Sequence, residues 1–287
     1  MEKITLNESS LSESNFVLLN ESHSPSLISL EEDVDLGGKT LYFVPGDVLR
    51  ANGGTLGGNG TLSGIVGIED TCQQLFQLGA DGKCTVTFAE DMVLNVPFLR
   101  PEWFGAKGDL VFKYAEKDRN DNDLPPYYID LIQLDQYNKG KCTDNSAAIN
   151  ETIRVAEELS IKTIKFNAAN YFVEESIVIH KGNLRLEGSG ALLREDQWIS
   201  VSDKKGGRIR SQIWNSRTST LFCSKGKNLI TIGEEHDPGD DITYPNSYAD
   251  SKNPGDPIII SDLQLWTEGF VWSDYDPEKD YLPSGIN

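Results

Sequence analysis

The chain has 287 residues and carries 45 acidic against 26 basic side chains, which gives a formal net charge of −19 at pH 7. A surface this acidic repels phosphate backbones, so nucleic acid is excluded as a partner. The hydrophobic content of 38% is enough for a folded core, and no stretch approaches the roughly 18 consecutive apolar residues that a membrane span requires.

The first 35 residues are rich in Ser, Asn and Glu and contain only short apolar islands. A segment of this composition buries little apolar surface, so we predict an extended arm that becomes ordered against a partner. Its first 20 residues lack the basic and apolar stretches of a secretory signal, and we therefore expect no secretion signal.

Residues 36–100 alternate short β-rich runs with glycine turns such as Gly53-Gly54 and Asn59-Gly60. This glycine density excludes a helix. Two-residue Asn-Gly turns are typical of antiparallel hairpins, whereas short strands at nearly regular spacing also suit the stacked strands of a solenoid. Both arrangements remain open for this stretch.

Cysteine usage predicts neither a disulfide scaffold nor a zinc site, because the four residues are few and scattered. A contact between Cys72 and Cys84 across a hairpin is compatible with the sequence, which does not establish it. We expect free thiols at all four positions: Cys72, Cys84, Cys142 and Cys223.

Two elements of contrasting character follow. Residues 110–142 include a polar run with Pro125-Pro126, which forbids a regular helix there and indicates an inserted loop. Residues 144–160 then place Ile149, Ile153 and Ala156 on one face at helical spacing, after Asp144 or Thr143 as the N-cap. We predict an amphipathic helix here.

Beyond this helix, short apolar runs separated by Asn, Gly or Lys turns predict β-strands. Strands this short without intervening helices exclude a doubly wound sheet, which leaves an all-β sandwich, barrel or solenoid. The predicted strands are 163–166, 171–173, 177–179, 184–186, 221–222, 229–232 and 258–260.

Two motifs narrow this choice. Residues 103–109 read WFGAKGD and residues 143–149 read TDNSAAI. Together they resemble the signature that opens right-handed parallel β-helices of the pectate-lyase superfamily, and Leu184-Arg185-Leu186-Glu187-Gly188-Ser189-Gly190 is similar to that family's early coils. The chain departs from the pattern where residues 110–142 replace a short link and where Asn167–Asn170 stand in place of Pro-x-Gly.

The resemblance implies an all-β fold, a right-handed parallel β-helix beginning near residue 101 and continuing to 287. It also implies that the 144–160 helix caps the first coil through Ile149, Ile153 and Ala156. Because members of this superfamily include polysaccharide lyases, glycosidases and phage tailspikes, the fold alone does not fix the chemistry.

Aromatic and acidic side chains near the C-terminus are the candidate glycan site. A platform of Trp266, Trp272, Asp274 and Tyr275 offers rings and a carboxylate to a sugar, although solvated loops between strands explain the same residues. Asp237, Asp240 and Asp241 suggest Ca²⁺ ligands but lack the spacing of an EF-hand loop, so we predict a polar turn, no metal and no cofactor. The sequence identifies no set of catalytic residues.

Two charge features remain. Seven Lys and Arg residues between 204 and 227 form either a solvated loop or a surface for docking adjacent subunits. The final residues, YLPSGIN, are similar to the entry into another coil, so we expect the polypeptide to continue or a partner to cover this end.

These observations favour a phage virion protein, a tailspike or tail fibre. We expect residues 1–35 to attach it to other virion proteins, the β-helix to contact host surface polysaccharide, and, from the resemblance, a homotrimer. A polysaccharide lyase or glycosidase is the alternative. The net charge disfavours anionic glycans unless Ca²⁺ or a local basic patch intervenes.

Overall fold

A computed structural model of the chain describes residues 2–11, 16–18, 24–114, 132–138, 140–190, 219–223, 228–232 and 257–267. Strands dominate this part of the chain, and most of them pair in parallel, so the all-β prediction is confirmed at that level. One cluster of buried apolar side chains extends from Leu6 to Ile230 and joins the N-terminal and C-terminal sheets.

The N-terminal sheet is built from parallel strands along its whole length. Inward side chains stack in register: Leu41 lies beside Leu62, and Leu62 beside Phe88, all three buried. The main order is β1 (Glu2–Leu6), β3 (Ser26–Leu30), β5 (Thr40–Ala51), β7 (Thr61–Ile68) and β8 (Thr87–Phe88). Further strands are β2 (Phe16–Leu18) on β5, β9 (Val93–Leu94) on β7, and β4 (Val34–Asp35) paired with β6 (Leu56–Gly57).

Parallel pairing decides between the two arrangements open for residues 36–100. The Asn59-Gly60 turn joins β6 to β7, which pair with other strands rather than with each other. The sheet is therefore not a series of hairpins. Cys72 and Cys84 are free thiols, as are Cys142 and Cys223.

The described part of residues 1–35 differs from the extended arm predicted for this segment. Residues 2–6 and 26–30 are strands of the same sheet as β5, and Leu6, Ile28 and Leu30 are fully buried. Sparse apolar residues suffice here because alternate side chains of a strand point to the same face, so a few of them fill the core. An arm ordered only against a partner does not describe these residues.

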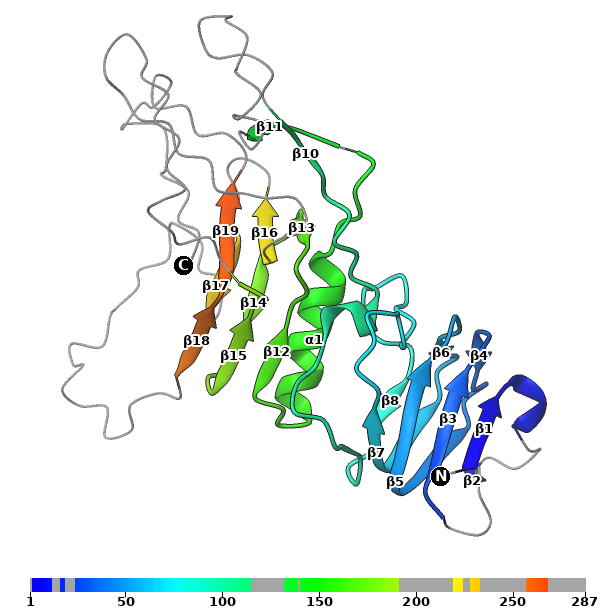
Figure 1. The fold of residues 1–287 in the computed structure, drawn as a ribbon. Helices are drawn as coiled ribbons and strands as arrows, with labels where there is room; N and C mark the ends of the chain where they lie inside the picture. Colours follow the sequence, from blue (N-terminus) through cyan, green and yellow to red (C-terminus); the bar gives the residue numbers. More distant parts are fainter. Residues whose placement is uncertain are drawn as a thin grey trace, which may run out of the picture.

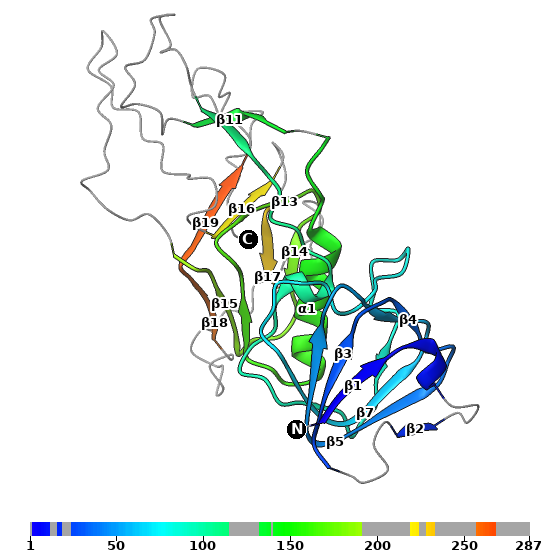
Figure 2. The same cartoon turned by 45° about the vertical axis from the view of Figure 1, so that its right-hand side comes forward.

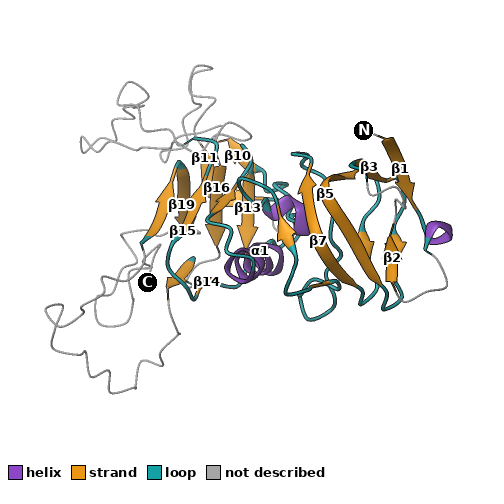
Figure 3. Ribbon diagram, turned by 90° about the horizontal axis from the view of Figure 1, so that it is seen from below, coloured by secondary structure: helices purple, strands orange, loops and turns teal. Residues whose placement is uncertain are grey.

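The junction contains the helix. A short 3₁₀ turn, η2 (Pro101–Phe104), precedes α1 (Ser146–Glu158), which falls within the predicted 144–160. Ile149, Ile153 and Ala156 are buried as expected. The helix lies between the N-terminal sheet and the C-terminal strands in three views (Figures 1, 2 and 3).

The inserted segment 110–142 begins and ends with paired strands. These are β10 (Phe112–Tyr114) and β11 (Ile132–Tyr137), which run antiparallel. The expected loop therefore rests on a two-stranded base. The residues between the strands lie outside the described part of the chain.

The C-terminal strands form three parallel sheets in which each strand pairs with the third strand after it. Tyr171 lies in register with Leu221, and Leu221 with Leu265. The sheets are β12 (Thr163–Lys165), β15 (Leu184–Glu187) and β18 (Ile258–Ser261); β13 (Asn170–Val173), β16 (Ser219–Cys223) and β19 (Leu263–Thr267); and β14 (Ile177–Ile179) with β17 (Ile230–Ile232).

Candidate functional site

The predicted glycan platform is only partly within the described structure. Trp266 lies in β19, where its backbone pairs in register with Phe222 of β16. Trp272, Asp274 and Tyr275 lie outside the described residues, as do Asp237, Asp240, Asp241 and the basic stretch 204–217 with Lys225 and Lys227. The platform therefore stays a prediction.

The two sequence motifs meet at the base of the insertion. Asp109 accepts hydrogen bonds from the backbone N–H of Thr143 (2.9 Å) and from its hydroxyl (2.7 Å). Asn138 adds a second tie, because its side-chain amide donates to the Asp109 carbonyl at 2.9 Å. These bonds close the base of the insertion.

Asn145 links this base to the first strands. It is fully buried, and its Oδ1 accepts from the Lys107 N–H at 2.6 Å, while its amide donates to the carbonyls of Thr143 and Phe172. The adjacent Asp144 accepts from the N–H groups of Ser146 and Glu174, both at 3.0 Å. The side chains of these motif residues therefore form hydrogen bonds that hold the fold together.

A buried carboxyl group lies at the same junction. Glu102 Oε1 accepts from the Tyr171 hydroxyl and from the Asn167 N–H (3.4 Å), whereas Oε2 has no partner in the described structure. Burial raises the pKa of Glu102, and burial together with this neighbouring carboxyl raises the pKa of Tyr171. Glu102 was not predicted as a site residue from the sequence, although an acid directly before Trp103 in an apolar run was a usable signal.

Arg100 extends this network toward the surface. Its guanidinium pairs with Asp70 through Nε and through Nη2 (3.0 Å), and Nη1 donates to the Asn167 side chain at 3.1 Å. The hydrogen bond from Arg100 lowers the pKa of Asp70. Both carboxylate oxygens of Asp70 are engaged by Arg100, and the bond from Arg100 to Asn167 connects this pair to the segment before β13.

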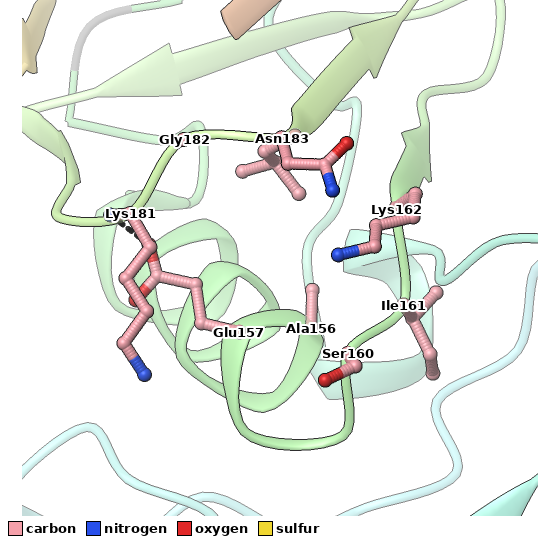
Figure 4. Close-up of a pocket in the computed structure, with 9 residues that line it drawn as sticks. Ala156, Glu157, Ser160, Ile161, Lys162, Lys181, Gly182 and Asn183 are labelled. Carbon is pink, nitrogen blue, oxygen red and sulfur yellow. Dashed lines mark hydrogen bonds between the residues drawn. The ribbon is translucent and has the colours of Figure 1, made fainter. Parts of the chain in front are cut away.

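An open hollow of about 480 Å³ lies where α1 ends (Figure 4). It is formed by the last turn of the helix, the lead into β12 and the turn between β14 and β15. Its polar lining comprises Glu157, Ser160, Lys162, Lys181 and Asn183. Residues distant in sequence meet here because β12 and β15 pair as neighbouring strands, which is why no motif pointed to the hollow.

The geometry of the hollow suits a polyhydroxylated ligand. Glu157 Oε1 accepts the N–H groups of His180 (3.1 Å) and Lys181 (2.8 Å) and so fixes the turn. Lys162 and Asn183 point toward one another, and Lys181 lies beside Glu157 (Figure 4). Ammonium, amide, hydroxyl and carboxylate groups together match the mixed donors and acceptors of a sugar.

A second hollow of about 360 Å³ shares Glu157 and runs along α1 toward the turn at Asp81. Glu151 in its wall accepts from Arg154 and from the Cys84 N–H at 2.8 Å. Burial raises the pKa of the Cys84 thiol to about 12, so this thiol stays protonated at neutral pH. Cys84, which neighbours the lining residue Lys83, is therefore not an activated nucleophile.

Within the ranges given above, no three His, Cys, Asp or Glu side chains come together as ligands for a metal ion. In the same ranges no helix combines the length and apolar character needed to cross a membrane.

Comparison with known proteins gives one partial similarity. The chain is 28% identical over 124 residues to a capsule K3-specific depolymerase, "Depolymerase 1", of Klebsiella phage KP32. The match covers 43% of this chain and 11% of the depolymerase, so the chain corresponds to a small part of that protein. No protein-family profile and no solved structure matches the chain.

Proposed function

We propose that the chain is part of a phage particle protein, a tailspike or tail fibre, that recognises host surface glycans. The observation that carries this proposal is the partial similarity to a phage capsule depolymerase. The polar hollow at the end of α1 supports it, since its donor and acceptor groups suit saccharide hydroxyls.

The proposed architecture is a right-handed parallel β-helix of the pectate-lyase type, sealed by α1. Its support is the three-strand pairing repeat from β12 to β19. The handedness follows from the general rule that connections between parallel strands of one sheet are right-handed in about 98% of cases. A helix over the first winding covers the outer edge of its strands, whose unpaired backbone groups otherwise invite association with another chain.

For the N-terminal region we propose attachment to other virion proteins, and for the assembly a homotrimer. Among the described strands, β1 has a neighbour on one side only, so its outer edge is available for pairing with another chain. Light scattering of the purified chain tests the trimer, which requires about three times the mass of the 31.8 kDa chain.

Catalysis is the second candidate, because the similar phage protein is named a depolymerase. The experiment is to mix the purified chain with Klebsiella K3 capsular polysaccharide and with a capsule of another type. Saturable binding without chain cleavage supports a recognition role, and a fall in polymer length supports a lyase or glycosidase. Absence of binding to both polysaccharides contradicts the proposed function.

A further inference from the structure

The hollow at the end of α1 is lined by two lysines, Lys162 and Lys181. In the described part of the chain, neither Lys162 nor Lys181 forms an ion pair. Both line the hollow together with Asn183, and the Lys162 and Asn183 side chains converge (Figure 4). An excess of positive over negative side chains in a concave site points to an anionic ligand.

The charges close to the hollow determine whether it attracts an anion, because at physiological ionic strength exposed charges are screened beyond about 8 Å. The net charge of −19 is spread over the whole chain and acts weakly within the hollow. Two lysines and one carboxylate, Glu157, line the hollow, and this carboxylate already accepts two backbone N–H groups. The C-terminal end of α1 adds roughly half a negative charge, so the balance stays positive.

The size and polarity of the hollow also limit its ligand. Its volume of about 480 Å³ falls within the range usual for small-ligand sites. The Asn183 amide and the Ser160 hydroxyl add neutral hydrogen-bonding groups to the two cations. A ligand that satisfies all of them carries hydroxyls and one negative group.

We propose that this hollow binds a single saccharide unit that carries a carboxylate. Lys162 and Lys181 supply the counter-charge, and Asn183 orients the unit through its amide. This inference rests on the proposed glycan recognition and adds a site and a charge preference to it. The site supplies the local basic patch that an acidic chain needs to hold an acidic glycan.

The test is an NMR titration of the full chain with sodium glucuronate, with glucose as the neutral control. We expect glucuronate to shift the amide signals of Lys162, Lys181 and Asn183 saturably and glucose to leave them in place. Exposed charge pairs are worth about 0.2–1 kcal/mol, so Lys162→Met and Lys181→Met should each weaken glucuronate binding by about 1.4- to fivefold. Equal shifts with glucose overturn the proposal.

Lys107→Met is the matched control. Its side chain is exposed and its backbone lies beside Asn145, at the opposite end of α1, about 20 Å from the hollow for a 13-residue helix. This variant should bind glucuronate like the wild type. Methionine keeps the aliphatic stem in all three variants, and equal melting temperatures would verify that each remains folded.

Binding of capsular polysaccharide distinguishes failure of this inference from failure of the proposed function. If the wild type binds capsule and the Lys162→Met, Lys181→Met double variant binds it equally well, the inference fails and the proposed function stands. If the wild type binds no capsule, the proposed function fails, and the glucuronate titration still decides whether the hollow takes a carboxylate.

Discussion

Asp109 and Thr143 hold together the two ends of the inserted segment 110–142. The carboxylate of Asp109 accepts both the backbone N–H and the hydroxyl of Thr143. Since closing a longer loop adds little entropic cost, an insertion at this point is tolerated as long as its base stays closed. The two motifs that flank the insertion thus act together to close its base.

Removing the Thr143 hydroxyl tests this clamp. Thr143→Val keeps the side-chain shape and the backbone bond but loses the hydroxyl bond to a carboxylate, so we expect a loss of about 1–2 kcal/mol in the free energy of unfolding. Thr143→Ser retains a hydroxyl and should lose far less. Urea denaturation of the three proteins measures the difference, and equal stabilities of the Ser and Val variants would refute the clamp.

Glu102 predicts a pH dependence of stability. Its pKa is raised above 4.5 in the folded chain because burial disfavours the charged form. The protonated carboxyl is therefore favoured in the folded state, and its contribution to stability is full below the unfolded pKa and is lost as the pH rises through the folded pKa.

Glu102→Gln mimics the protonated carboxyl at every pH. Between pH 4.5 and 7.5, the stability of this variant relative to the wild type should rise. Urea midpoints of both proteins at the two pH values isolate Glu102 from the other titrating groups. A constant difference between the proteins would show that the carboxyl does not titrate in this window.

The packing of α1 against the strands on either side depends on its buried face. Ile149 is fully buried between the two sheet regions, and truncating a buried Ile to Ala costs about 2–5 kcal/mol. Glu158→Ala, on the exposed face, removes only a surface ion pair with Arg154 and should cost less than about 1 kcal/mol. Thermal unfolding of both variants checks this, and comparable melting temperatures would contradict this packing of α1.

Gly188 allows the chain after β15 to approach the turn between β18 and β19 closely. A Cβ at this position would lie 1.9 Å from the carbonyl oxygen of Asp262, a backbone atom that cannot give way without moving β18 or β19. Gly188→Ala should therefore destabilise the chain by about 1–3 kcal/mol or more.

Gly67→Ala is the control, because its nearest neighbour would be 3.6 Å away. Hydrogen exchange should show faster exchange at residues 258–267 in the Gly188 variant only. Unchanged protection of these strands would mean that the windings do not pack as described.

The C-terminal strands were largely predictable from the sequence, because their apolar runs are short and bounded by turn residues. The predicted strand 177–179 coincides with β14, and the predicted helix 144–160 contains α1. β19 was missed, since Asp262 at φ 57° makes a tight turn that leaves no loop between β18 and β19.

The N-terminal strands and the hollow were not predictable from the sequence. In β1 and β3 the inward residues, such as Leu6 and Ile28, are diluted by Ser, Thr, Glu and Lys, so composition suggested an arm. The hollow forms only when the turn at Lys181 stacks beside Lys162, a contact between distant positions without a local pattern.

Disulfide trapping across β12 and β15 tests the parallel winding most directly. In the parallel register, Thr163 faces Arg185 and Lys165 faces Glu187, within the Cα separation that a disulfide spans. Thr163 and Glu187 are then two positions out of register and about 8 Å apart, too far for a bridge.

In a background with the four native cysteines replaced, double cysteine variants at 163/185 and 165/187 should oxidise to disulfides. Variants at 163/187 and 165/185 should remain reduced under the same conditions. The opposite pattern is that of an antiparallel pair, and observing it would contradict the stacked parallel windings on which the proposed architecture depends.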